Sequence, residues 1–195
     1  PACAHSCVGR IRYMGVLLYD ADRIEEMVAL PEDQLLDAQL DAILDPRDER
    51  VIAAAAAEGI DAGWIDAAQR SPVYSFVKEW GLALPLHPEY RTAAMMFYVP
   101  PLSPVISTIE RNLVRLDLPE ERADFELLDE LDKARLPVQY LANLFSIGDQ
   151  EPIRRILKSM LAVRSFKRRE SVDQEIDETT LAMLASAGLT LELAE

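Results

Sequence analysis

The prolines between residues 82 and 104 constrain this chain more than any other feature. They stand in "LALPLHPEYRTAAMMFYVPPLSP" at Pro85, Pro88, Pro100, Pro101 and Pro104. A proline inside a helix removes a backbone donor and clashes with the preceding turn, so no helix can run through this stretch. We predict one strand here, in "TAAMMFYV", and otherwise extended or turn structure that wraps across a surface.

Helical patterns flank the proline-rich stretch on both sides. Asp20 or Asp22 can cap a first helix, and "EDQLLDAQLDAILD" carries apolar residues at helical spacing. Asp45 with Pro46 predicts the start of a further helix, and Gly59 predicts its end. The acidic "LPEERADFELLDELDKA" also has a helical pattern. The fold class is therefore mainly α: an irregular helical domain with a proline-rich extended segment and at most a short β hairpin or strand pair.

The segment "EPIRRILKSMLAVRSFKRRE" at residues 151–170 is the basic exception in an acidic chain. Its sequence predicts an amphipathic helix whose apolar face consists of Ile153, Ile156, Leu157, Met160 and Leu161. The opposite face carries the lysines and arginines. That face is either simply solvated or contacts an anionic lipid surface or an acidic partner subunit.

The overall composition excludes several classes of function. The formal net charge is −14 over 195 residues, which argues against nucleic-acid binding through a general electrostatic field. The apolar runs are too short to span a bilayer, and we find no secretory signal pattern. Two cysteines do not make a disulfide scaffold, so we expect a reducing, intracellular compartment.

Few residues carry recognisable chemistry. Cys3 and Cys7 form a C-x3-C pair with His5 between them, which is either a part of a metal site or two incidental thiols. His87 lies between prolines and is expected to be a hydrogen-bonded structural residue. We find no nucleophile–base constellation and no phosphate-binding loop. Four aromatic residues surround the proline-rich stretch and belong either to the core or to an interface: Trp80, Tyr90, Phe97 and Tyr98.

Four stretches, in order, resemble the β subunit of respiratory, membrane-bound nitrate reductase. They are "CAHSCVGRIRYMGVLLYDADRIEE", "IDAAQRSPVYSFVKEWGLALPLHPEYRT", "MMFYVPPLSPV" and "LPVQYLANLFSIGDQEPIRRILKSMLAVRSFKRRE". The resemblance runs from the first residue to about residue 170. Residues 107–134 match poorly, and we assign them no role beyond helix and surface.

This resemblance implies an iron–sulfur electron-transfer protein with a helical C-terminal region. The family's β subunit carries three [4Fe–4S] clusters and one [3Fe–4S] cluster between a haem-containing membrane γ subunit, which oxidises quinol, and a molybdenum-containing α subunit. Cys3 and Cys7 match its last two cluster ligands and would serve two different [4Fe–4S] clusters. We therefore expect residues 1–15 to be the tail of a ferredoxin-like region and residues 16–195 to be the helical C-terminal domain.

The resemblance also implies what this chain should bind, where it should be located, and which residues should act at the clusters. The remaining cluster ligands would lie upstream, so this chain alone should bind no cluster, should be inactive, and could self-associate. We expect no bond-making chemistry in the subunit, and a location at the cytoplasmic face of the membrane through its partners. The backbone amides of Val8 and Gly9 are expected donors to cluster sulfur, and Arg10 and Arg12 expected electrostatic partners. Residues 84–104 are an expected docking surface.

Two other interpretations stay open on the sequence. The first is a β subunit of a related molybdoenzyme that acts on another oxyanion or a hydrocarbon, or that oxidises nitrite. The second is a helical interaction domain with no redox role, in which both cysteines are incidental.

Overall fold

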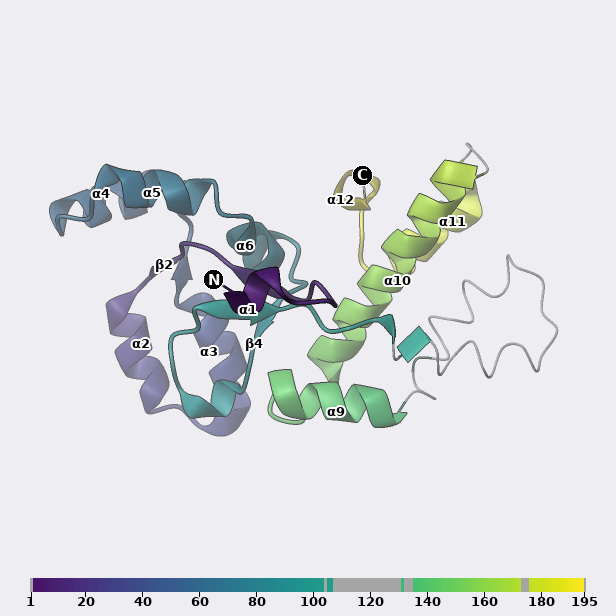
Figure 1. Ribbon diagram of the computed structural model, residues 1–195, viewed down its shortest axis with the longest axis horizontal. Helices are drawn as coiled ribbons and strands as arrows, with labels where there is room; N and C mark the ends of the chain where they lie inside the picture. Colours follow the sequence, from purple (N-terminus) through teal and green to yellow (C-terminus); the bar gives the residue numbers. More distant parts are fainter. Residues whose placement is uncertain (1, 104, 107–130, 132–134, 173–175, 195) are drawn as a thin grey trace. The chain divides into compact units, whose positions relative to one another are not determined.

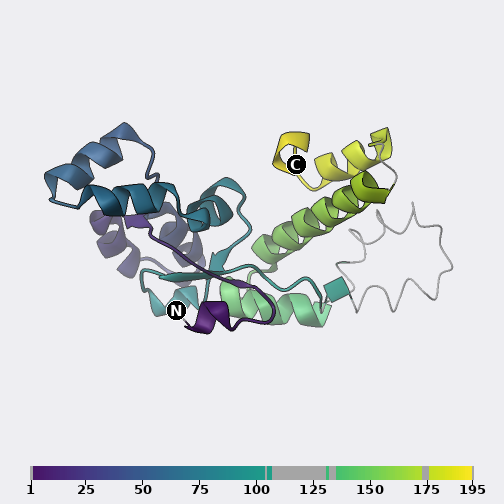
Figure 2. The same cartoon turned by 45° about the horizontal axis from the view of Figure 1, so that its top comes forward.

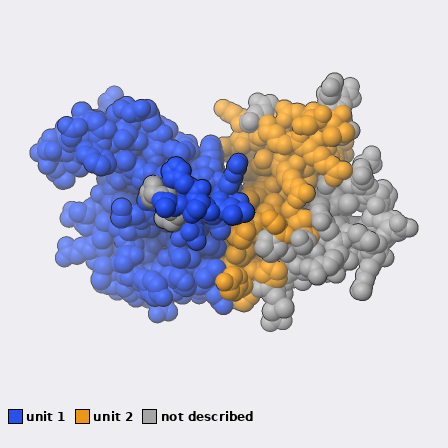
Figure 3. Space-filling model, viewed as in Figure 1, with its two compact units in different colours: residues 1–99, 143–147 blue, residues 100–142, 148–195 orange. Residues whose placement is uncertain are grey.

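The computed structural model describes residues 2–103, 105–106, 131, 135–172 and 176–194 (Figure 1). The acidic helix predicted over residues 118–134 lies outside these residues, apart from Leu131. The chain divides into two compact units, coloured separately in Figure 3. Unit 1 comprises residues 1–99 and 143–147, and unit 2 comprises residues 100–142 and 148–195. Within the described ranges, no helix is both long enough and apolar enough to cross a membrane.

Helices dominate the described residues, which confirms the mainly α prediction. In unit 1 they are α1 (Ala2–His5), α2 (Ala21–Val28), η1 (Glu32–Gln34), α3 (Leu35–Asp41), α4 (Glu49–Ala57), α5 (Ala62–Gln69), α6 (Pro72–Tyr74), the π-helical η2 (Ser75–Glu79) and η3 (Pro88–Tyr90). Helix α9 (Arg135–Phe145) begins in unit 2 and ends in unit 1. Unit 2 continues with α10 (Gln150–Val172), α11 (Glu178–Ser186) and α12 (Leu191–Ala194).

Unit 1 contains two small antiparallel sheets. The first has the order β1 (Arg12–Met14), β5 (Met96–Tyr98), β4 (Leu84–Pro85), and the second pairs β2 (Leu18–Tyr19) with β3 (Ile43–Leu44). The central β5 is the strand predicted from "TAAMMFYV", and its Phe97 is buried opposite Tyr13 and Pro85. The predicted limit of one hairpin or strand pair was wrong. Strands of two or three residues leave no periodic signal, because distant pairing rather than local sequence defines them.

The helix ends were predicted with mixed success. The Asp20 carboxylate accepts the N–H groups of Asp22 and Arg23 and caps α2, as predicted. Gly59 has φ +80° after α4, which confirms its predicted role as the stop. The predicted start of α4 was wrong: Asp48 is the N-cap, three residues later than expected.

The error at the start of α4 has a local cause. The Asp45 carboxylate accepts the N–H of Arg47 at 2.9 Å, and the Asp48 N–H donates to the Asp45 carbonyl at 3.2 Å. Asp45 therefore begins a turn rather than a helix. The residues before it, predicted to extend the α3 helix, instead form β3 because they pair with β2.

The core of unit 2 is the apolar face of α10. Ile153, Ile156, Leu157 and Leu161 are buried, as predicted, while Met160 is only half-buried. Helix α11 packs beside α10 (Figures 1 and 2). The apolar stripe of α10 therefore stabilises unit 2 by burial against its neighbour.

Candidate functional site

The Cys7 thiol lies in a tight turn between α1 and β1. The Arg10 N–H donates to the Cys7 carbonyl at 3.0 Å, and Arg10 adopts φ +51°, in the left-handed region. This turn directs the backbone N–H of Ile11, and also those of Arg12 and Arg10, toward the Cys7 sulfur. These hydrogen bonds, chiefly that of Ile11, together with the positive charge of Arg12, lower the pKa of the half-exposed Cys7 thiol.

The donor set around Cys7 suits a thiolate metal ligand. A thiol must lose its proton to bind iron, and amide donors stabilise the resulting negative charge on sulfur. The amides directed at the Cys7 sulfur are those of residues 10–12, while donation from the Val8 and Gly9 amides to cluster sulfur stays a prediction. The chemistry of the site therefore fits an iron–sulfur cluster at Cys7.

The other predicted ligand cannot be placed in the same detail. Cys3 lies in α1, but its side chain is outside the described part of the structure, so its role as the ligand of a second, neighbouring cluster stays a prediction. His5 is exposed at the end of the same helix. Among the described residues, no group of three or more His, Cys, Asp or Glu side chains is arranged to hold a metal ion.

Arg12 connects the Cys7 turn to the small sheet. It stands opposite Tyr98 in the β1–β5 register, and its guanidinium carbon lies 6.0 Å from the centre of the Tyr98 ring. That ring in turn lies 5.9 Å from the ring of Phe145. The cationic residue predicted near the cluster site therefore lies over a tyrosine ring that itself packs, tilted, against Phe145.

The proline-rich stretch presents an exposed tyrosine on a well-anchored turn. His87 and Arg91 both adopt the left-handed conformation, at φ +53° and +55°, and flank η3. The His87 ring hydrogen-bonds through Nδ1 to Glu89 at 2.7 Å and stacks on the Tyr90 ring at 5.1 Å. His87 is thus hydrogen-bonded, as predicted, and Tyr90 stays 68% exposed.

Two further contacts hold this turn against the helices before it. The Arg91 guanidinium donates to the carbonyls of Val28 and Leu30, at 3.0 and 2.6 Å. The buried Gln39 amide donates to the Pro88 carbonyl at 2.7 Å. Non-glycine residues in the left-handed region are strained, and such strain persists only where the surroundings fix the backbone. The turn is therefore suited to presenting Tyr90 rigidly.

A groove of about 890 Å³, open to solvent, crosses unit 1 on the side of the β2–β3 ladder. Leu18, Leu44, Val51 and Ala55 form apolar parts of its lining. Six carboxylates also line it, from Asp20, Asp22, Asp41, Asp45, Asp48 and Glu58, against three cations. Sequence reasoning missed this groove, although the aspartates clustered around the ends of α2, α3 and α4 were its visible signal.

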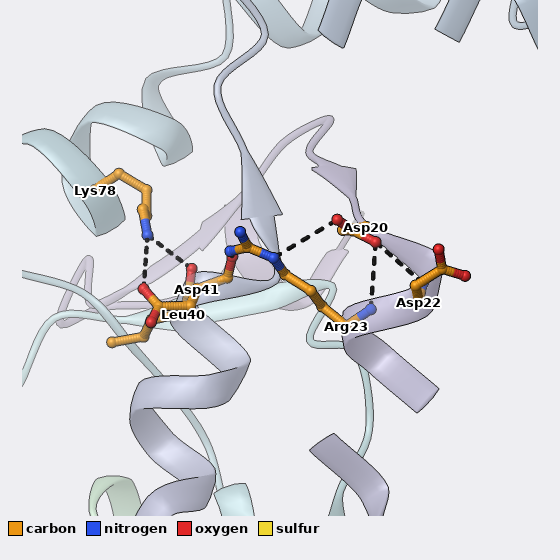
Figure 4. Close-up of polar contacts among 6 residues, drawn as sticks. All are labelled: Asp20, Asp22, Arg23, Leu40, Asp41 and Lys78. Carbon is orange, nitrogen blue, oxygen red and sulfur yellow. Dashed lines mark hydrogen bonds and ion pairs between the residues drawn. The ribbon is translucent and has the colours of Figure 1, made fainter. Parts of the chain in front are cut away.

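The three cations of the groove are all engaged locally. Figure 4 shows Arg23 donating to the carbonyl of Asp41 at 2.7 Å and pairing with Asp20 at 3.6 Å. Lys78 donates to the carbonyl of Leu40 at 2.9 Å and pairs with Asp41 at 3.5 Å. These two cations satisfy carbonyls at the end of α3, where helices leave acceptors unpaired.

Only some of the groove carboxylates form an ion pair with a cation of the groove. Arg50, the third cation, pairs with Asp48 at 2.8 Å and lowers the pKa of that carboxyl. Within the described residues, no ion pair reaches Asp22, Asp45 or Glu58. The groove therefore combines an apolar lining with an excess of negative charge.

This chain is similar to known respiratory nitrate reductase β chains. Residues 102–191 match the model of the respiratory nitrate reductase β C-terminal region. The respiratory nitrate reductase 1 β chain of Shigella flexneri is 51% identical over 180 residues, and that of Escherichia coli 50%, each covering 92% of this chain and 34% of the relative. The nitrate reductase β chain of Bacillus subtilis is 43% identical over 194 residues, covering 99% of this chain and 38% of the relative.

The chain spans about a third of the length of these relatives. The family-model match begins near residue 100, where unit 2 also begins. The family resemblance predicted from the four sequence stretches is confirmed.

Proposed function

Because the chain is homologous over almost its whole length to respiratory nitrate reductase β chains, we propose that it is the C-terminal part of an electron-transfer subunit. In this proposal the complete subunit relays electrons from a haem-containing, quinol-oxidising membrane subunit to a molybdenum-containing catalytic subunit. The complex is held at the cytoplasmic face of the membrane by its membrane subunit. The chain itself supplies cluster ligands and docking surfaces, and carries out no bond-making step.

The setting of Cys7 is the observation that supports this function most directly. A low thiol pKa and converging backbone amides are what an iron ligand requires, and incidental cysteines have no need of either. A [4Fe–4S] cluster bound here would accept and release one electron at a time. We propose that Cys7 completes one such cluster and Cys3 a neighbouring one, with the other ligands upstream.

The residues around Cys7 would set the reduction potential of a cluster bound there. Amide hydrogen bonds to sulfur and nearby positive charge both favour the more negative, reduced state, so they raise the reduction potential. The Ile11 amide acts on the thiolate directly, and Arg12 acts as a positioned charge, held over the Tyr98 ring. Changing Arg12 to Gln should therefore lower the potential of the cluster at Cys7, and Arg12→Lys should restore most of it.

The decisive experiment uses the complete β subunit, expressed anaerobically with its partner subunits. Iron and labile sulfide are measured and the clusters are resolved by EPR, for Cys3→Ser and Cys7→Ser separately. We expect each substitution to alter a different cluster signal. Val8→Ser is the matched control, because the Val8 side chain is fully exposed one residue from Cys7. Unchanged spectra in both cysteine variants would refute the electron-relay function of this site.

We further propose that residues 84–104 contribute to docking of the catalytic subunit. Tyr90 is the natural anchor, because an exposed aromatic ring on a rigid turn loses little conformational entropy on binding. Tyr90→Ala should weaken assembly by about tenfold or more if Tyr90 is an interface hot spot. Tyr140, which is 65% exposed on α9, provides the control Tyr140→Ala. Equal assembly of both variants would exclude Tyr90 as an anchor.

A further inference from the structure

The acidic groove beside the β2–β3 ladder has a composition that selects its occupant. We propose that it seats a short segment of another polypeptide, a partner subunit, that carries lysine or arginine beside apolar side chains. This inference rests on the proposed place of the chain in a multi-subunit complex, but not on its clusters.

The apolar part of the groove comes from the alternation of side chains along the ladder. Tyr19 and Ile43 face the interior: the Tyr19 hydroxyl donates to the Ala94 carbonyl at 2.7 Å, and Ile43 is buried. Their neighbours Leu18 and Leu44 are paired with each other on the opposite face and are only half-buried. The groove therefore has an apolar pair of strand side chains with no covering element among the described residues.

The net charge of the groove predicts the sign of the charge that its occupant carries. Six carboxylates face three cations, and each of those cations is already paired with a carboxylate. The excess negative charge rests on Asp22 and Glu58, and in part on Asp45, which also interacts with the Arg47 guanidinium and the Tyr74 hydroxyl. An anionic ligand is disfavoured there, whereas long basic side chains can lay their aliphatic stems on the leucines and reach the carboxylates with their charged ends.

The shape of the groove argues for a polypeptide. Its volume of about 890 Å³ is at the upper end of the range for ligand pockets, roughly 300–1,000 Å³, but it is open rather than closed around a small molecule. The three carboxylates that have no ion pair among the described residues come from the starts and ends of different elements. No three of the described carboxylates converge as a metal site, so a bound metal ion does not explain them.

The test is carried out on the assembled complex with the complete β subunit. Glycine ethyl ester with carbodiimide labels accessible carboxylates, and carbodiimide alone joins carboxylates to lysines within ion-pair distance; both products are located by mass spectrometry. We expect Glu58, Asp45 or Asp22 to be labelled about fivefold less in the complex than in the isolated subunit. Where the occupant carries lysine, the cross-linked peptide should belong to a partner subunit.

Charge reversal supplies the matched variants. Glu58→Lys should remove the protection of Asp45 and Asp22 and weaken segment binding by about three- to tenfold. Glu25→Lys changes another exposed glutamate, on α2 and outside the groove, and should leave the protection intact. Position 58 is at the C-cap of α4, where a cation suits the helix dipole, so loss of binding there cannot be attributed to a weakened helix.

Three results would overturn the inference. Equal labelling in the complex and the isolated subunit would mean that the groove stays open. Cross-links to the upstream region of the same subunit would mean that the groove is covered within one chain. If a small polyamine alone gives the same protection of the groove carboxylates in the isolated subunit, and no cross-link to a partner subunit forms in the complex, the groove binds a free cation instead. Cluster spectra are recorded on the same samples, so the proposed electron-relay function is tested independently of the proposed docking in the groove.

Discussion

Gly15 is the position at which a single added methyl group should reveal how β1 is packed. A Cβ atom placed on Gly15 would lie 2.1 Å from Ser71 Oγ and 3.0 Å from Val73 Cγ2. Both neighbours are buried at the start of α6. Gly15 directly follows β1, so Gly15→Ala should force the end of β1 away from the start of α6, and β1 is the strand that directly follows the Cys7 turn.

The magnitude follows from the contacts. Gly15 itself is exposed, but the added methyl group would press against two buried side chains. Such overpacking typically costs about 1–3 kcal/mol, and we expect about 2 kcal/mol here, because rotation of the Ser71 hydroxyl relieves its clash but not the contact with Val73. The buried Ser71 hydroxyl has no hydrogen-bond partner among the described residues, so Ser71→Ala alone should be neutral or stabilising by a few tenths of a kcal/mol. The double variant should recover about 1 kcal/mol of the loss.

Urea unfolding followed by tryptophan fluorescence measures this directly. The two tryptophans of the chain, Trp64 and Trp80, both lie in unit 1, so their signal reports unit 1. With an unfolding slope of about 2 kcal/mol per molar urea, a loss of about 2 kcal/mol moves the midpoint down by about 1 M. A Gly15→Ala midpoint equal to that of the native chain, or a double variant no more stable than Gly15→Ala, would refute the close packing of β1 on α6.

Two titrations test other parts of the structure. Burial raises the pKa of Tyr19 to about 12, so its contribution to stability is complete below pH 10 and is lost as the pH rises toward 12; absorbance titration should show one late tyrosine that Tyr19→Phe removes. Hydrogen bonds to Asp177, chiefly from the Thr180 side chain, lower the pKa of that carboxyl, so its stabilisation of α11 is present above the usual aspartate pKa and is lost as the pH falls through the lowered value. The protection of the Thr180 amide against hydrogen exchange, taken relative to its intrinsic exchange rate at each pH, should fall on that acidification, and Asp177→Asn should abolish this pH dependence.

Features of the fold that depend on neighbouring residues could be predicted from the sequence. The cap at Asp20 and the stop at Gly59 involve contacts within one helical turn, and the apolar face of α10 is a matter of spacing alone. Features that depend on distant pairing could not. Strand β4 is two residues long and exists because it meets β5, twelve residues later. Likewise, the groove assembles carboxylates from separate elements, and only the fold brings them together.

At the Cys7 site, too, one part could be predicted from the sequence and another only from the fold. Substitutions of Arg10 test this distinction. A thiol is a property of the residue, so the sequence identified the ligand; the amides that lower its pKa come from the turn, which requires φ +51° at Arg10. Glycine adopts this conformation freely, whereas a β-branched residue strongly resists it. Arg10→Gly should therefore keep the Cys7 thiol pKa low, and Arg10→Val should return it toward 9.0, the ordinary value.

Alkylation of Cys7 by iodoacetamide as a function of pH, in a Cys3→Ser background, measures that pKa because only the thiolate reacts. Both variants remove the same positive charge, so a difference between them isolates the backbone contribution. If both move the pKa equally, the low value comes from the charge at position 10 rather than from the turn. In that case the low pKa of the Cys7 thiol could have been predicted from the sequence, because the charged residue is a neighbour in the chain.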